Sequence, residues 1–266
     1  MSRVVTSLTN PAVKAVRALH ARKDRETTGL FLAEGLKIVG EALESRRSPR
    51  TLMYAADAAD HPLLRRAVDA TERARGTVLE VTREVLAKVS RRDNPQTVIG
   101  VFEQRFTPLD ELRPDAAACW VALEQVRDPG NLGTVIRTAD AAGCGGVVLI
   151  GDCVDPYSVE AVRATMGSIF AVPVARATQE AFLVWRQSWP GSVVGARLQA
   201  TTSHADAPYR RPTLIVMGAE QAGLSDAVAD GCDLTVRIPM RGRADSLNLA
   251  VATGIMIYAV TGRFEP

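Results

Sequence analysis

The apolar positions of the first hundred residues follow two different spacings. Val13, Val16 and Leu19 recur every three residues, and this spacing predicts one face of an amphipathic helix. Helical patterns occupy residues 11–22, 35–43 and 62–73. Short apolar runs typical of strands occupy residues 28–32, 52–54, 77–79 and 97–101. This alternation predicts a small α/β domain over residues 1–106.

The apolar runs in the rest of the chain are short and almost uninterrupted. Five of them are predicted strands, over residues 120–123, 147–150, 192–195, 214–217 and 234–236. Helical patterns separate several of these runs, as expected for a mostly parallel sheet that helices cover on both faces. Residues 116–266 are therefore predicted to form a second α/β domain. Residues 107–115 contain Pro108 and Pro114 among mixed charges and are predicted to be a linker.

Three polar segments follow predicted strands of the second domain, at the edge where a parallel sheet builds its ligand site. They are residues 124–133, 218–225 and 238–248. Small residues in each segment let a ligand approach the backbone. The polar side chains that can converge there are Asn131, Arg137, Glu220, Ser246 and Asn248. Taken singly, each segment also fits a turn, a helix cap or a solvated helix face.

Positive charge is concentrated in the first domain. The 266-residue chain has a net charge of +2. Residues 1–106 contain 19 Lys and Arg against 13 Asp and Glu, a net charge of +6, and the remainder contains 13 against 17, a net charge of −4. A basic domain joined to an acidic one indicates that the first meets a polyanion while the second has another task.

Several functional classes lack their sequence signatures. No Gly-x-Gly-x-x-Gly follows a strand, and Walker A, Gly-x-Ser-x-Gly and His-Glu-x-x-His motifs are absent from the sequence. The four cysteines form no Cys-x-x-Cys and only three histidines occur, so we expect no metal site, no disulfide framework and a reduced, cytoplasmic compartment. No apolar run reaches 18 residues and the start of the chain soon turns polar, so we expect no membrane span and no signal peptide.

In their order along the chain and their amino-acid sequences, the polar segments resemble the three motifs of the SpoU/TrmH family of RNA ribose 2′-O-methyltransferases, within the SPOUT superfamily. The matching positions are Asp128-Pro129-x-Asn131-x-Gly133-x3-Arg137-x-Ala139-x3-Gly143, Met217-Gly218-x-Glu220-x2-Gly223-Leu224, and Ile238-Pro239-Met240 followed by Ser246-Leu247-Asn248. An intermediate segment, residues 163–168, also fits the family. Ala219 and Gln221 stand where many members carry Asn and Gly, which predicts a local difference in the backbone.

The first domain is similar, through weaker cues, to the small ribosomal-protein-like RNA-binding domain that many members carry. One cue is Asn10-Pro11-x2-Lys14, and another is Phe31-Leu32-Ala33-Glu34-Gly35. The resemblance therefore implies that residues 1–106 bind the RNA substrate. It implies that residues 116–266 form the catalytic domain, an α/β SPOUT domain with a parallel sheet whose C-terminal segment threads a loop into a deep trefoil knot.

The resemblance also implies S-adenosyl-L-methionine as the cofactor, bound in the knot mostly by backbone groups. The residues that it assigns to the cofactor are Gly218, Ile238 and Leu247, with Met217, Pro239 and Met240 alongside. Family members are typically dimers in which both subunits complete each site. We therefore expect a homodimer.

The reaction that the resemblance implies is attack of a ribose 2′-hydroxyl on the methyl group of the sulfonium. The family assigns the activating role to Arg137, while Asn131, Ser246 and Asn248 orient the ribose and a neighbouring phosphate. An arginine pKa above about 12 makes Arg137 a poor proton acceptor, so we expect it to stabilise the developing alkoxide as a cation. Glu220 is the residual candidate for the base.

The expected substrate is ribosomal RNA of the large subunit, because a separate N-terminal domain suits recognition of a folded hairpin or loop. A tRNA substrate is the alternative within the same enzyme class. A non-catalytic RNA-binding protein on the same scaffold is the alternative from another class. Against that last alternative stands the joint presence of the five polar candidates, which such a protein would not need.

Overall fold

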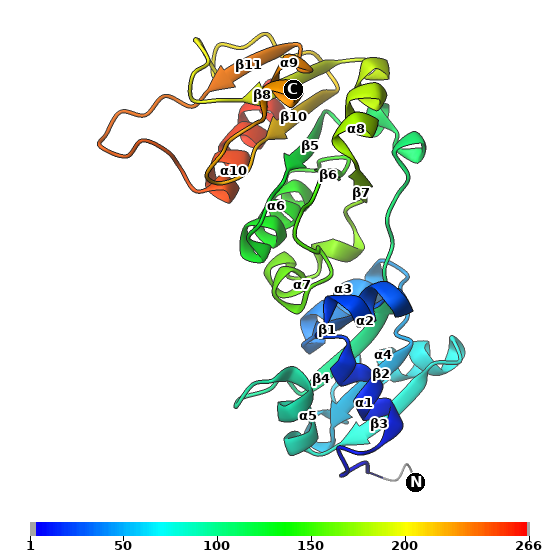
Figure 1. Ribbon diagram of the computed structural model, residues 1–266. Helices are drawn as coiled ribbons and strands as arrows, with labels where there is room; N and C mark the ends of the chain where they lie inside the picture. Colours follow the sequence, from blue (N-terminus) through cyan, green and yellow to red (C-terminus); the bar gives the residue numbers. More distant parts are fainter. Residues whose placement is uncertain (1–3, 265–266) are drawn as a thin grey trace. The chain divides into compact units, whose positions relative to one another are not determined.

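The structure is a computed structural model that describes residues 4–264, and the chain folds into two compact units (Figure 1). The first unit comprises Met1–Gln104 together with Asp155–Ala171, and the second comprises Arg105–Val154 together with Val172–Pro266. Residues 155–171 lie within the range predicted for the second domain, yet they pack within the first unit. The chain therefore passes between the units at three points, after Gln104, Val154 and Ala171.

The first unit is built on a mixed sheet with the strand order β1-β4-β2-β3. Its strands are β1 (Leu30–Glu34), β2 (Thr51–Ala55), β3 (Thr77–Val81) and β4 (Val98–Glu103). Strand β4 is antiparallel to β1 and β2, and β2 is parallel to β3. The helices from its N-terminal part are α1 (Pro11–Ala18), α2 (Arg22–Thr28), α3 (Leu36–Glu44), α4 (Pro62–Arg73) and α5 (Arg83–Ser90), with a 3₁₀ turn η1 (Ala56–Ala58). Helix α1 packs against α5, and α3 packs against α4.

The helix predicted over residues 11–22 ends four residues early, and a separate helix, α2, begins at Arg22, because a buried arginine binds the carbonyl groups between them. Helix α1 ends at Ala18, and Nη1 of Arg25 donates to the carbonyl oxygens of Leu19 and His20 at 2.8 and 2.9 Å. The strand predicted from residue 28 begins two residues later, because Gly29 caps α2 with a φ of 67°. Helix α2 has no apolar residue, so hydrophobic periodicity did not reveal it.

An ion pair and aromatic contacts explain why residues 155–171 belong to the first unit. Nε of Arg25 lies 2.8 Å from Oδ2 of Asp155, and these side chains are only 5% and 7% exposed. The ring of Phe31 packs on that of Tyr157 with centroids 4.6 Å apart, and also on that of Phe170 at 5.7 Å. The segment thus adds an ion pair and two aromatic rings to the interior of the first unit.

A second ion pair joins the same segment to strand β1. The segment forms helix α7 (Val159–Thr165) and a 3₁₀ turn, η4 (Ser168–Phe170). From α7, Nη2 of Arg163 lies 2.9 Å from Oε2 of Glu34, the last residue of β1, whose side chain is only 4% exposed. This pairing compensates the buried charge of Glu34 at Oε2, as burial of charge requires, while Oε1 of the same carboxylate is buried without a hydrogen-bond partner among residues 4–264.

The second unit is built on a parallel sheet with the strand order β7-β6-β5-β10-β8-β11-β9. The strands are β5 (Cys119–Glu124), β6 (Val147–Ile150), β7 (Val174–Ala177), β8 (Ser192–Ala196), β9 (Thr202–Ser203), β10 (Thr213–Met217) and β11 (Leu234–Arg237). The five predicted strands are confirmed within two residues at either end, and β7 and β9 were not predicted. Met217 pairs with Leu123, so the polar segments after β10 and β5 begin side by side.

Helices cover this sheet. The first polar segment runs into the start of α6, and the third ends at the residue before α10. The helices are α6 (Pro129–Ala141), α8 (Gln179–Trp185), α9 (Asp226–Asp230) and α10 (Leu249–Thr261), with 3₁₀ turns η2 (Leu109–Glu111), η3 (Pro114–Ala116) and η5 (Arg186–Ser188). Helices α6 and α10 pack side by side on the sheet (Figure 1). No helix in residues 4–264 has the length and hydropathy that a membrane span requires.

Candidate functional site

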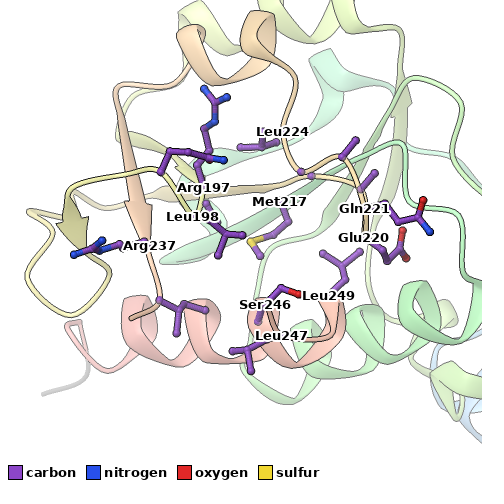
Figure 2. A pocket seen from close by; sticks show the side chains of 18 of the residues that line it. Arg197, Leu198, Met217, Glu220, Gln221, Leu224, Arg237, Ser246, Leu247 and Leu249 are labelled. Atoms are coloured by element: carbon purple, nitrogen blue, oxygen red, sulfur yellow. The ribbon is translucent and has the colours of Figure 1, made fainter. Parts of the chain in front are cut away.

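A pocket of about 360 Å³ lies at the carboxyl ends of strands β8, β10 and β11 (Figure 2). Its lining comes from residues 196–199, 217–224, 236–240 and 245–252. Figure 2 shows Met217 in the middle, with Glu220 and Gln221 on one side and Leu198 on the other. The volume is within the range of small-molecule and cofactor sites, and its position follows the rule for parallel sheets.

Five of the six residues predicted to contact a cofactor line this pocket. They are Met217, Gly218, Ile238, Met240 and Leu247. The sixth, Pro239, lies between two lining residues and is not itself part of the lining. Three separate loops therefore bring these residues together around one cavity.

Gly218 lacks room for a side chain because of the chain itself. A Cβ atom at this position would lie 1.9 Å from the carbonyl carbon of Gly223 and 2.1 Å from the backbone nitrogen of Leu224. The backbone N–H of Gly223 donates to the carbonyl oxygen of Ala219 at 2.9 Å. Glycine at position 218 therefore lets this loop close on itself beside the pocket, rather than only making room for a ligand.

The loop does not need glycine where the chain departs from the family pattern. Ala219 and Gln221 have no positive φ, and within this loop the left-handed conformation occurs at Gly223, with a φ of 67°. The end of the loop is fixed by Glu124, the last residue of β5. Its carboxylate accepts hydrogen bonds from the backbone N–H and the hydroxyl of Ser225 at 2.8 and 2.6 Å.

One chain of hydrogen bonds joins all three polar segments. Asn248 caps helix α10, where its Oδ1 accepts from the N–H groups of Ala250 and Val251 at 2.9 and 3.3 Å. Its Nδ2 is therefore free to donate to Oδ1 of Asn131 at 2.9 Å. Nδ2 of Asn131 in turn donates to Oε1 of Glu220 at 3.1 Å. The helix cap thus sets the direction of every bond in this amide chain, which we define as Asn248, Asn131 and Glu220.

Glu220 ends the amide chain as an ionised acceptor. Partial burial raises the pKa of its carboxyl, but hydrogen bonds from the Asn131 side chain and from the backbone N–H groups of residues 220, 127 and 128 outweigh burial and lower the pKa below its ordinary value. A carboxylate with a lowered pKa is a weak proton acceptor. Glu220 therefore suits the positioning of Asn131 better than the role of a base.

The other two polar candidates lie outside the amide chain. Arg137 is exposed on α6, and its side chain forms no hydrogen bond or ion pair with residues 4–264. Ser246 lines the pocket, and its hydroxyl donates to Oδ1 of Asp245 at 3.4 Å. The fold thus joins three of the five candidates directly, places Ser246 at the pocket and leaves Arg137 available to another molecule.

Residues 196–199, at the carboxyl end of β8, line the pocket and were not predicted. Arg197 donates to Oδ1 of Asp226 at 2.8 Å, so a carboxylate partly neutralises its charge. Leu198 remains 53% exposed and is available to cover a ligand. The signal was present in the sequence, because residues 192–195 were a predicted strand whose carboxyl end should also face the site.

The lining suits S-adenosylmethionine. Apolar side chains that fit the faces of a purine ring are Met217, Ile238, Met240, Leu247 and Leu249. The carboxylates of Glu220 and Asp245 add negative charge for a cationic sulfonium or amino group. Nothing in residues 4–264 provides a group of three or more side chains arranged to bind a metal ion.

A parallel sheet with a cofactor-sized pocket at its strand ends, together with a separate basic unit, is typical of an α/β enzyme that acts on a polyanion. The model of the SpoU rRNA Methylase family matches residues 118–258, and that of the MRM3-like substrate binding domain matches residues 10–100. The chain belongs to the SpoU rRNA methylase family. It is an RNA methyltransferase whose cofactor is S-adenosylmethionine.

Characterised relatives cover nearly the whole chain. The 23S rRNA (guanosine(2553)-2′-O)-methyltransferase RlmP of Bacillus subtilis is 30% identical, over 97% of this chain and 99% of its own. The 23S rRNA (uridine(2479)-2′-O)-methyltransferase of Streptomyces viridochromogenes is 31% identical, over 92% of this chain and 87% of its own. The solved AdoMet-bound rRNA methyltransferase of Sinorhizobium meliloti has a TM-score of 0.92 and 46% identity, covering 100% of this chain and 99% of that one.

Proposed function

We propose that this protein transfers a methyl group from S-adenosylmethionine to the 2′-hydroxyl of one ribose in large-subunit ribosomal RNA. The observation that carries the proposal is the amide chain, because it unites the three polar segments beside a pocket that suits the cofactor. The relatives named above support the large-subunit substrate. Residues 1–106 would bind the RNA substrate, and residues 116–266 would catalyse methyl transfer. Residues 107–115 would connect the two domains.

The cofactor, when bound, supplies an activated methyl group, so the chain must position the ribose and manage one proton. Asn131 and Asn248 are held by the amide chain and would orient the ribose, with Ser246 beside them. Arg137 has no partner among residues 4–264, so its guanidinium group would stabilise the developing alkoxide and contact a phosphate. The proton would then leave through phosphate or water, because Glu220 is a weak acceptor.

A homodimer and the trefoil knot belong to the same proposal. Helix α10 leaves Val251 and Tyr258 53% and 58% exposed, and apolar side chains in such positions favour a partner surface. Arg137, which has no partner among the residues that the structure describes, suits a site completed by the second subunit. A cytoplasmic location is the expected one for an enzyme that modifies ribosomal RNA.

The test is transfer of a labelled methyl group by the purified protein, with large-subunit rRNA and total tRNA as competing substrates. We expect label in one nucleotide of large-subunit rRNA, located by mapping 2′-O-methyl sites in cells with and without the gene. Label in tRNA alone would favour the alternative substrate. Binding of RNA without any transfer would favour the non-catalytic alternative.

A further inference from the structure

The first unit has a hollow of about 310 Å³ whose lining is dominated by arginine. Its lining residues are Leu43, Arg46, Arg47, Ser48, Arg66, Ala70 and Arg73. They come from the C-terminal end of α3, from the loop that follows it, and from α4, which packs against α3. We call this hollow the arginine pocket. No acidic side chain is among its lining residues.

Contacts with the protein hold three of the four guanidinium groups in the arginine pocket. Nη2 of Arg47 donates to the carbonyl oxygen of Glu103 at 2.6 Å, and Nε of Arg73 donates to that of Asp69 at 3.1 Å. Nη2 of Arg66 lies 2.8 Å from Oε1 of Glu44. Arg66 and Arg73 keep further N–H donors for a ligand, because a guanidinium carries five.

Positive charge remains in the arginine pocket after its neutralising groups are counted. Four of its lining residues are arginines, and one of them, Arg66, pairs with the carboxylate of Glu44. The C-terminal ends of α3 and α4 are each equivalent to about half a negative charge. Arg46 and Arg73 form no ion pair with an acidic side chain within residues 4–264. An ordinary solvated surface would instead scatter such charges and pair them with acids.

We propose that the arginine pocket grips a phosphodiester of the RNA backbone and thereby helps the first unit bind the substrate. The inference rests on the proposed function, since it assumes that RNA is the substrate. Arginine forks match the oxygens of a phosphate, and the hydroxyl of Ser48 adds a donor from the same rim. Backbone phosphates position the RNA and carry no sequence information, so this site would set affinity and register rather than the choice of nucleotide.

The direct test is a double variant, Arg46→Gln with Arg73→Gln, which removes the two guanidinium groups that lack acidic partners. We expect the affinity for a 23S rRNA fragment to fall about tenfold at low salt, and the slope of log affinity against log salt to decrease by about one. We expect the KM for the RNA fragment to rise by a larger factor than kcat falls, because the arginine pocket holds the RNA and does not touch the reacting groups. A Lys-for-Arg version keeps the charge and loses the forked geometry, so an intermediate loss is expected.

The matched control is Arg65→Gln with Arg83→Gln, which removes the same charge from the same unit. Arg65 and Arg83 pair with Asp60 and Asp57 and do not line the arginine pocket. Equal losses of RNA affinity in the two double variants, or no loss in either, would overturn the proposal that the arginine pocket binds RNA. If the wild-type protein bound the fragment but transferred no methyl group, the proposed function would be wrong. The assignment of the arginine pocket as an RNA-binding site would not be affected.

A competition experiment separates RNA backbone from free phosphate as the occupant. Inorganic phosphate is compared with chloride at equal ionic strength as a competitor of the RNA fragment. We expect phosphate to displace the RNA from the wild-type protein more strongly than from the Arg46→Gln, Arg73→Gln variant. Tight binding of phosphate by the wild type, with RNA affinity unaffected by either the anion or the variant, would contradict the proposal.

Discussion

Each unit has a polar cluster that joins segments far apart in the sequence, but the clusters differ in burial. In the first unit, Arg25 and Asp155 pair in the interior with at most 7% of either side chain exposed. In the second unit, the amide chain lies at the surface beside the pocket. Loss of one partner from a buried pair leaves an uncompensated charge, whereas an exposed amide can bond to water instead. The first cluster should therefore control stability and the second activity.

The largest effect is expected from Asp155→Asn, which leaves the Arg25 guanidinium buried without its counter-charge. We expect the free energy of unfolding of the first unit to fall by about 3–5 kcal/mol. All three tryptophans, Trp120, Trp185 and Trp189, lie in the second unit. Amide hydrogen exchange therefore reports unfolding of the first unit, and tryptophan fluorescence reports unfolding of the second. The variant should lower the denaturant midpoint of the first unit more than that of the second.

The exposed pair of Arg65 and Asp60 provides the control for that experiment. Asp60→Asn should change stability by less than about 1 kcal/mol, because solvent screens the pair. Replacing both buried partners, with Arg25→Met and Asp155→Leu, should restore much of the lost stability. A single Asp155→Asn variant as stable as wild type would remove the basis of the comparison.

The next effect in size is expected from Arg137→Ala, which should reduce kcat by about 10²–10³-fold by removing a cation from the developing alkoxide. Cofactor binding, measured by calorimetry, should be nearly unchanged because Arg137 does not line the pocket. Arg186→Ala is the matched control, since Arg186 pairs with Asp233 away from the pocket lining. Normal turnover by the Arg137 variant would exclude Arg137 from the mechanism.

A smaller effect is expected from Asn248→Asp, which separates the helix cap from the amide chain. The aspartate still accepts from the first turn of α10, but it cannot donate to Asn131. We expect stability within about 1 kcal/mol of wild type and a decrease in kcat of about tenfold, since one positioning hydrogen bond is lost. Steady-state kinetics and thermal unfolding measure both quantities. A loss of stability with unchanged kcat would show that the amide chain controls stability and not activity.

The smallest effect concerns the pH dependence of stability. Because the folded-state pKa of Glu220 is lowered, its carboxylate contributes stability above its unfolded pKa of about 4.3, and this is lost as the pH falls through the folded value. Glu220→Gln should therefore flatten the acidic limb of the stability curve slightly. Denaturant unfolding between neutral and acidic pH measures the difference. A steeper acidic limb in the variant would show that the sign is wrong.

The packing of residues 155–171 also decides how substrate binding can be tested. Deletion of residues 1–106 would remove the partners of Asp155, Tyr157 and Phe170 and expose two aromatic rings. Loss of RNA affinity after such a deletion would combine misfolding with lost contacts. Point variants in the arginine pocket avoid this problem because their side chains lie on the surface of one unit.

The sequence predicted the second unit better than the first. Its central strands are buried on both faces and therefore appear as continuous apolar runs, and its polar motifs directly follow these strands. In the first unit, α2 has no apolar residue, and α1 stops early because Arg25 takes the next two carbonyls. Neither feature leaves a periodic signal, so hydrophobic spacing could not reveal them.

The sequence by itself determined the local chemistry of this protein: which runs are apolar, which polar side chains follow them, and where charge collects. Only the tertiary structure decided that β10 lies beside β5, that residues 155–171 join the first unit, and that the cap at Asn248 directs the amide chain. It also decided that helix α4 and the loop after α3 bring four arginines around one hollow. The physical reason is that strand order, burial of charge and hydrogen-bond direction depend on contacts between residues far apart in the chain, which local periodicity does not specify.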